Sequence, residues 1–198
     1  MRKLLVLAAT MMLAAPLGAR AQEFIEHKPT LQVDAAPGKV EVLEFFWYGC
    51  IHCYNLEPVI ESWLKKQPKD VEFRRVPAVF NERWAHDAAI YYTLEALGLL
   101  DKLHRPLFDA IHKSRLRTDN REEFSGWLQK NGVDSKKFME TVKSFGVQSK
   151  TRRAVQQTLA YKIDGTPAMA VHGRYTIPAQ SNLLGVVDSF VDRARKEK

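Results

Sequence analysis

The apolar positions of the chain alternate between short unbroken runs and longer stretches with helical spacing. Residues 40–46 show almost no alternation of apolar and polar side chains, which predicts a central β-strand covered on both faces. Residues 51–66 repeat apolar side chains at helical spacing and predict an amphipathic helix, which Pro58 is expected to kink. Residues 71–77 predict a second strand, which is parallel to the first if the helix crosses back over the sheet.

The middle of the chain carries only helical patterns. Asn120 and Glu123 have the spacing of a capping box, and Asp134 or Ser135 is expected to cap the helix that follows and ends before Gly146. Their apolar stripes are typical of a helical core rather than of a cofactor pocket. The expected helices cover residues 84–97, 101–112, 120–131, 134–145 and 147–161.

Strand patterns return near the end of the chain. Residues 168–171 and 175–177 flank a short turn and predict a hairpin. Ser181 or Asn182 is expected to cap a terminal helix that ends near residue 196. The segment before residue 40 is rich in turn residues and predicts a loose arm, with a possible short strand at 31–33.

The two cysteines of the chain stand where the first predicted strand gives way to a helix. The run ends in Trp47-Tyr48-Gly49-Cys50, and Cys53 follows one helical turn later. A thiolate at a helix N-terminus lies near unpaired backbone N–H groups and the positive end of the helix dipole, so the pKa of Cys50 is expected to fall. Cys53 is close enough to attack the sulfur of Cys50. The pair can therefore give a disulfide to another protein or take one from it.

Other interpretations of the two cysteines are weaker. A structural zinc site needs four ligands, and the sequence offers neither a third cysteine nor a His pair at finger spacing, so no metal site is expected. A structural disulfide across so small a ring would remove little entropy from the unfolded chain. Two buried cysteines without a role are less consistent with their position after a strand in an exported protein.

The first residues predict export. Met1-Arg2-Lys3 is followed by an apolar run over residues 4–17 and by Ala19-Arg20-Ala21, which together are typical of a signal peptide of residues 1–21, cleaved after Ala21. The apolar run is short for a membrane span, although an uncleaved anchor stays an alternative. Export matters for the chemistry because a dithiol outside the cytosol can be kept oxidised.

Length and charge set further limits. Cleavage after Ala21 leaves 177 of the 198 residues, enough for one domain or for one domain with an insertion. The 30 Lys and Arg residues fall to 27 without Arg2, Lys3 and Arg20, against 23 Asp and Glu, so the mature net charge is +4. This balance, without aromatic residues among the basic clusters, does not indicate nucleic-acid binding.

The dithiol segment resembles a known family. Leu43-Glu44-Phe45-Phe46, the Cys-x-His-Cys core, Tyr54 and Glu57 are similar to the active-site strand and helix of the DsbA family, the periplasmic thiol:disulfide interchange proteins of the thioredoxin superfamily. The element order extends this resemblance across nearly all of the mature chain. It implies an α/β thioredoxin fold with a helical domain inserted into it. The expected parts are 22–80 and 150–198 for the thioredoxin-like domain and 81–149 for a lid-like helical domain.

The resemblance also implies roles around the dithiol. Sequence alone favours a trans Thr166-Pro167 bond, but the superfamily carries a cis-proline opposite its dithiol, where the preceding backbone can pair with a substrate peptide. His52, between the cysteines, is expected to stabilise the Cys50 thiolate. Ile51 replaces the usual proline of the family and is expected to alter the redox equilibrium.

Glu44 has two interpretations. The pattern of the strand favours a partly exposed acid, whereas the family carries a buried acid six residues before the first cysteine. Such a buried acid would have a raised pKa and could move a proton during disulfide exchange. The role of Glu57 stays open between proton transfer and stabilisation of the first turns of the helix.

These features predict a periplasmic dithiol oxidase that donates a Cys50–Cys53 disulfide to exported proteins as they fold. Substrates would lie on an apolar groove near Trp47, Tyr48 and the Thr166-Pro167 loop. The redox-active disulfide replaces any bound cofactor, the protein is expected to be a monomer, and family likeness implies a quinone-linked inner-membrane reoxidant of the DsbB type. The alternatives are a disulfide isomerase or reductase of the same superfamily, and a peptide-binding chaperone whose cysteines are incidental.

Overall fold

A five-stranded mixed sheet organises the computed structural model, which describes residues 24–197. The strand order is β1-β5-β4-β2-β3; β2 and β3 pair in parallel, and the other neighbours are antiparallel. The parallel β2–β3 pair confirms the expected crossover by the helix between them. The strands are β1 Ile25–Glu26, β2 Val40–Phe46, β3 Val71–Pro77, β4 Ala168–Val171 and β5 Tyr175–Pro178.

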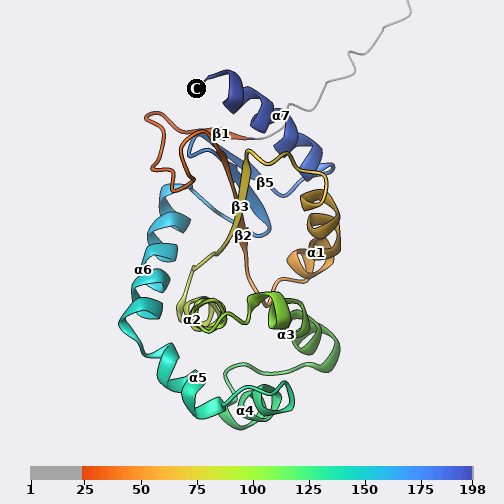
Figure 1. Ribbon diagram of the computed structural model, residues 1–198, viewed down its shortest axis with the longest axis vertical. Helices are drawn as coiled ribbons and strands as arrows, with labels where there is room; N and C mark the ends of the chain where they lie inside the picture. Colours follow the sequence, from red (N-terminus) through yellow and green to blue (C-terminus); the bar gives the residue numbers. More distant parts are fainter. Residues whose placement is uncertain (1–23, 198) are drawn as a thin grey trace, which may run out of the picture.

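Helices surround this sheet and extend beyond one end of it (Figure 1). Helices α2 to α6 lie between β3 and β4 in sequence, and α2 to α5 form a block beside the sheet, while α6 runs from that block back to the sheet. The helices are α1 Ile51–Leu64, α2 Glu82–Ala96, α3 Leu100–Ser114, α4 Arg121–Lys130, α5 Ser135–Val142, α6 Phe145–Ala160 and α7 Leu183–Lys196.

Both faces of the sheet are covered, which explains the unbroken apolar run of β2. All seven residues of β2 are buried. Val40 and Val42 pack into a cluster with side chains of α1 and α7, whereas Leu43 and Phe45 pack into a larger cluster with side chains of α2 and α6. Each fully buried aliphatic or aromatic side chain of this kind stabilises the fold by about 1.5–3 kcal/mol.

The short strand of the N-terminal arm lies elsewhere than expected. Residues 31–33 form no strand, and the arm pairs with the sheet at β1 instead. Leu31 makes one backbone hydrogen bond, to Gly173 O at 2.8 Å, in the turn between β4 and β5. The hydrogen-bonded ladder between β1 and β5 does not continue to residues 31–33, because the arm crosses the turn there rather than running along β5.

Three helix ends also differ from the expectation. The fifth helix ends at Val142 because Ser144 caps the next helix, accepting a hydrogen bond from the backbone N–H of Val147 at 3.4 Å. Gly146 therefore lies in the first turn of α6 and is not a stop signal. Asn182 has a left-handed backbone, with φ of 58°, and its side chain does not cap α7.

Two expectations concern the membrane and the first residues. No helix within residues 24–197 is long and apolar enough to cross a membrane. The signal peptide of residues 1–21 and its cleavage after Ala21 lie outside the described residues.

Candidate active site

Cys50 lies in the junction between β2 and α1, and Cys53 lies in the first turn of α1. Figure 1 shows this junction between the sheet and helices α2 and α3. Cys50 is the N-cap residue of α1, and its Sγ accepts a hydrogen bond from the backbone N–H of Cys53 at 3.3 Å. Sulfur here takes the role that Ser or Asp oxygen has in other helices, which is to satisfy an unpaired N–H of the first turn. No disulfide bond joins the two cysteines in this structure.

The two sulfurs have opposite electrostatic surroundings. The hydrogen bond from the Cys53 thiol, with further ones from the Thr166 side chain and the backbone N–H groups of Cys53 and His52, lowers the pKa of Cys50 to about 5 despite its partial burial. Burial raises the pKa of Cys53, and the nearby Cys50 and Glu44 raise it further. At neutral pH Cys50 is therefore a thiolate, and Cys53 is a neutral thiol.

The loop before β4 meets the dithiol from the other side. The Thr166-Pro167 peptide bond is cis, and the Sγ of Cys50 is 3.3 Å from the carbonyl oxygen of Thr166. The fold brings Cys50 and Thr166 together although they lie 116 residues apart in the sequence. The resemblance thus places this loop correctly against Cys50, where base rates for X–Pro bonds alone would have favoured trans.

A shallow groove of about 270 Å³ begins beside the dithiol. His52 lines it together with Pro167, and Val59 contributes an apolar side chain that is 52% exposed. Ile51, 48% exposed, lies at the start of α1 beside His52. The remaining lining residues are Asn55, Leu56, Ala179, Gln180 and Leu183.

A buried charged cluster lies beneath the dithiol. Glu44 of β2 and Glu57 of α1 are 0% and 1% exposed, and both contact the guanidinium group of Arg75 from β3. Arg75 Nε is 3.0 Å from Glu44 Oε2, and Arg75 Nη2 is 2.9 Å from Glu57 Oε2. Burial raises the pKa of Glu44 to about 8, with Arg75 opposing the shift and Glu57 adding to it. Glu44 is therefore the fully buried acid that the resemblance implied, not the partly exposed one that the pattern favoured.

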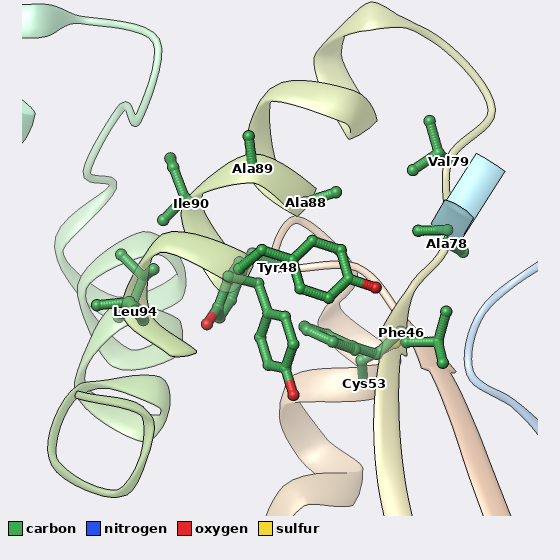
Figure 2. Close-up of a cluster of buried hydrophobic side chains, with 14 of the residues drawn as sticks. Phe46, Tyr48, Cys53, Ala78, Val79, Ala88, Ala89, Ile90 and Leu94 are labelled. Atoms are coloured by element: carbon green, nitrogen blue, oxygen red, sulfur yellow. The ribbon is translucent and has the colours of Figure 1, made fainter. Parts of the chain in front are cut away.

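Burial corrects the expectation that Tyr48 contacts substrates. Its side chain is 1% exposed, and its hydroxyl group lies 2.8 Å from Nδ1 of His104, so it reaches no surface. Figure 2 shows Tyr48, Phe46 and Cys53 gathered with side chains of α2 in the larger core cluster. Tyr48 therefore supports the dithiol loop from inside.

Trp47 lies toward the surface on the helical side of the dithiol. Its indole ring stacks on that of Trp84 at 4.2 Å between centroids, and its Nε1 donates a hydrogen bond to Asp87 at 2.8 Å. A methyl group on Gly49 would lie 2.4 Å from this ring, so only glycine leaves room for it. Phe80, 44% exposed, packs edge-on against Trp84. The three rings form one apolar surface, here named the aromatic platform.

Sequence patterns did not point to several of these residues. Arg75, His104, Trp84 and Asp87 surround the dithiol, yet each lies in a stretch that reads as an ordinary strand or amphipathic helix. The strand 71–77 gave no clear signal for Arg75, because it also carries Glu72 and Arg74, and charged residues are ordinary on a partly exposed edge strand. No group of three potential metal ligands occurs within residues 24–197.

Comparisons with known proteins agree with this geometry. Residues 75–188 match the family model described as a DSBA-like thioredoxin domain. The thiol:disulfide interchange protein DsbA of Bordetella parapertussis is 42% identical, with 96% of this chain and 93% of the relative covered. That of Azotobacter vinelandii is 40% identical, with 90% and 84% covered.

Solved structures give the same result. The crystal structure of Pseudomonas aeruginosa DsbA matches with a TM-score of 0.82 at 35% identity, covering 89% of this chain and 94% of that one. The oxidoreductase DsbA from Xylella fastidiosa matches with a TM-score of 0.81 at 30% identity, covering 87% and 95%. These findings confirm the expected α/β thioredoxin-like fold with its inserted helices, and the chain belongs to the DsbA family.

Proposed function

We propose that this protein is a periplasmic dithiol oxidase that donates its Cys50–Cys53 disulfide to exported proteins as they fold. The observation that carries the proposal is the unequal placement of the two sulfurs: Cys50 Sγ caps α1 and accepts the backbone N–H of Cys53 at 3.3 Å, whereas Cys53 is 0% exposed. This placement lowers the pKa of Cys50 to about 5 and raises that of Cys53. A thiolate that is stabilised in the reduced form makes the disulfide a strong oxidant, because reduction yields a favourable product.

The reaction proceeds by two thiol–disulfide exchanges. A substrate thiolate attacks Sγ of Cys50 in the oxidised protein, the Cys50–Cys53 bond breaks, and Cys53 leaves with the electron pair and takes up a proton. A second substrate thiolate then attacks the substrate sulfur of the mixed disulfide, and Cys50 leaves as a thiolate. The substrate has lost two electrons, and the protein has gained them.

Glu44 supplies the proton that Cys53 needs. Cys53 is 0% exposed, so its leaving thiolate has no direct access to water. Burial keeps Glu44 protonated at neutral pH, since its pKa is about 8, and it lies close enough to Cys53 that its ionised form would raise the pKa of that thiol. The neutral acid can donate its proton when Cys53 leaves and recover it when Cys53 is oxidised again.

Substrates bind as extended chains around Cys50. The Thr166 carbonyl beside Cys50 can pair with a peptide backbone, which gives affinity with little side-chain selectivity. The groove beside His52 and Pro167 and the aromatic platform containing Trp47 extend this surface in two directions. His52 can stabilise the thiolate, and Ile51 tunes the redox equilibrium.

Residues 81–149 form a helical domain that covers the dithiol between the two parts of the thioredoxin-like domain, 22–80 and 150–198.

The reoxidant and the compartment follow from the same chemistry. Each turnover leaves the dithiol reduced, so electrons must pass to an external acceptor, which by family likeness is a quinone-linked inner-membrane protein of the DsbB type. Export through the signal of residues 1–21 brings the protein to the periplasm, where a disulfide persists. The protein acts as a monomer, without a metal or another cofactor, and has no nucleic-acid partner.

The decisive experiment is the equilibrium of the dithiol with glutathione, followed by oxidation of a reduced, unfolded client. A strongly oxidising equilibrium constant and loss of client oxidation in Cys50→Ala support the oxidase. A reducing constant would select the reductase or isomerase instead. Retained cellular function in Cys50→Ala, with clients still bound, would favour a chaperone whose cysteines are incidental.

A further inference from the structure

Two buried carboxylates share one cation beneath the dithiol. Glu44 and Glu57 both contact Arg75, and the one other group within residues 24–197 that could pair with either as a cation is His104, 3.3 Å from Glu57, when its ring is protonated. If both carboxylates were ionised, the cluster would carry a net negative charge away from water, which is strongly unfavourable. One of the two carboxyl groups must therefore hold a proton, and their contacts determine which one.

The contacts of the two carboxylates are unequal. Glu57 accepts two hydrogen bonds from Arg75, at 2.9 and 3.2 Å. Nε2 of His104 lies 3.3 Å from Glu57 Oε1 as a further partner. Glu44 contacts the same guanidinium group at one point only, Oε2 at 3.0 Å from Nε, and because that N–H is directed at Glu57, neither oxygen of Glu44 accepts a well-aligned hydrogen bond among the described residues. Hydrogen bonds to the charged form favour it, so Glu57 is the better site for the charge.

His104 is held in the state that this role requires. Tyr48 places its hydroxyl group 2.8 Å from Nδ1 of His104, and the ring packs against Phe46 and Phe108. Burial lowers the pKa of His104, which keeps the ring neutral. A neutral ring has one N–H, and an ionised carboxylate can only accept, so Nε2–H donates to Glu57 while Nδ1 accepts from Tyr48.

We propose that His104 is a positioning residue that assigns the shared proton: by donating Nε2–H to Glu57 it keeps that carboxylate ionised and leaves Glu44 as the neutral acid beneath Cys53. This inference deepens the proposed function and rests on it for its purpose, because only a neutral Glu44 can protonate the leaving Cys53.

The pKa values of the two carboxyl groups are shifted in the directions that this assignment requires. Burial acts to raise the pKa of Glu57, yet the hydrogen bond from His104, the charge of His104 where its ring is protonated, and Arg75 hold it below its usual value, whereas the pKa of Glu44 is raised to about 8. The groups that face the two carboxylates and His104 are Arg75 from β3, Cys50, Cys53 and Glu61 around α1, Tyr48 and Tyr91.

The test follows both carboxyl groups by NMR. The full chain, labelled with 13C at the glutamate carboxyl carbon, is titrated in its oxidised form, where neither cysteine ionises; Glu44→Gln and Glu57→Gln assign the signals. His104→Phe keeps the ring in its aromatic surroundings and removes the N–H. We expect the midpoint of Glu57 to rise and that of Glu44 to fall from the raised value that its burial gives it. His104→Gln, which can donate to Glu57 and accept from Tyr48, should restore both midpoints.

A second variant keeps the test decisive if His104→Phe does not fold. Tyr48→Phe removes the hydroxyl group that fixes the imidazole tautomer and should move both midpoints in the same directions, by less. Unchanged midpoints in a folded His104→Phe, or in Tyr48→Phe where it alone folds, would overturn the assignment. The titration uses no substrate, so its outcome is independent of the glutathione measurement that tests the oxidase function.

Discussion

Cys50 owes its reactivity to an unusual use of its side chain as a helix cap. Its sulfur lies where the N-cap oxygen of Ser or Asp would accept the N–H of the first turn, and it also faces the thiol of Cys53. The thiol of Cys53 and the backbone N–H groups act on the same atom, and the thiol has the larger effect on the pKa. A variant that removes the Cys53 thiol separates these two contributions.

Cys53→Ala should raise the pKa of Cys50 from about 5 without restoring that of a free thiol. The variant loses the hydrogen bond from the Cys53 thiol but keeps the backbone N–H of residue 53, which lies 3.3 Å from the sulfur. Thiolate absorbance near 240 nm, followed against pH, measures the midpoint. An unchanged midpoint would mean that the Thr166 side chain and the backbone N–H groups hold the charge without the Cys53 thiol.

Ile51→Pro should leave dithiol oxidation intact and shift the equilibrium with glutathione. Residue 51 is the first of α1, a position where proline is tolerated because its missing N–H has no partner within the helix. The measurement is the equilibrium constant of the variant against that of the native protein. Val59, exposed in the second half of α1, gives a control site: Val59→Ala should leave the constant unchanged.

The chemistry of the site was predictable only where it is local in sequence. Cys50 and Cys53 lie three residues apart, so their spacing at a helix start predicts both the nucleophile and its partner. Arg75 and His104 reach Glu57 across 18 and 47 residues, and no pattern near them shows that contact. The inward orientation of Tyr48 was hidden for the same reason, since its partner His104 is distant in sequence.

At the level of elements, two glycines of similar appearance in sequence have opposite roles. Gly126 lies inside α4, and a methyl group there would meet nothing within 4 Å. Gly173 has φ of +67°, and a methyl group there would lie 2.3 Å from the carbonyl oxygen of Leu31. Gly126 therefore costs conformational entropy on folding without any packing requirement for glycine. Gly173, in contrast, lets the arm lie against the turn between β4 and β5.

Gly126→Ala should therefore stabilise the protein by about 0.5–1 kcal/mol, because alanine restricts the unfolded chain and favours the helix. Gly173→Ala should destabilise it by about 1–3 kcal/mol through backbone strain and the clash with Leu31. Urea unfolding of both variants, with equal m-values, gives the two free energies. Stabilisation by Gly173→Ala would show that the arm leaves this turn freely.

Helix positions were predictable, and helix ends less so. Asn120 and Asp134 cap α4 and α5 as expected, because an Asn or Asp side chain at such a position reaches the N–H groups two and three residues on. Ser144 caps α6 in the same way, so the helix that was expected to continue to residue 145 ends at Val142 instead. Local capping strength, rather than apolar spacing, decides where adjacent helices separate.

In the whole molecule, the dithiol lies where the sheet and the helical block meet. The sheet contributes Glu44 and Arg75, and the helical block contributes His104 and Trp84. His112 of α3 also lies with its Nε2 2.8 Å from the carbonyl oxygen of Tyr48, next to the dithiol loop. Contacts from both parts set the protonation of Glu44. The stability of the entire fold therefore depends on pH through this one carboxyl group.

The oxidised protein should lose stability through Glu44 as the pH rises from 4.5 to 8. The pKa of Glu44 is 4.5 in a model peptide and about 8 in the fold with free cysteines; the disulfide removes only the charge of Cys50, which is the smallest of the causes, and leaves burial, which is the largest. Between the two values the folded state therefore holds a proton that the unfolded state has released. The stabilisation is complete below pH 4.5 and is lost as the pH passes 8, by roughly 3–5 kcal/mol in all.

Glu44→Gln isolates this effect, because the amide resembles the protonated acid and does not titrate. Buried His27 and His104, whose pKa values are lowered, make stability rise with pH near 6.5 in both proteins, so only the difference between them reports on Glu44. Urea unfolding of the two oxidised proteins should give similar stability at pH 4.5 and a more stable variant at pH 8. A constant difference across this range would mean that Glu44 is already ionised in the fold, and that Cys53 must obtain its proton elsewhere.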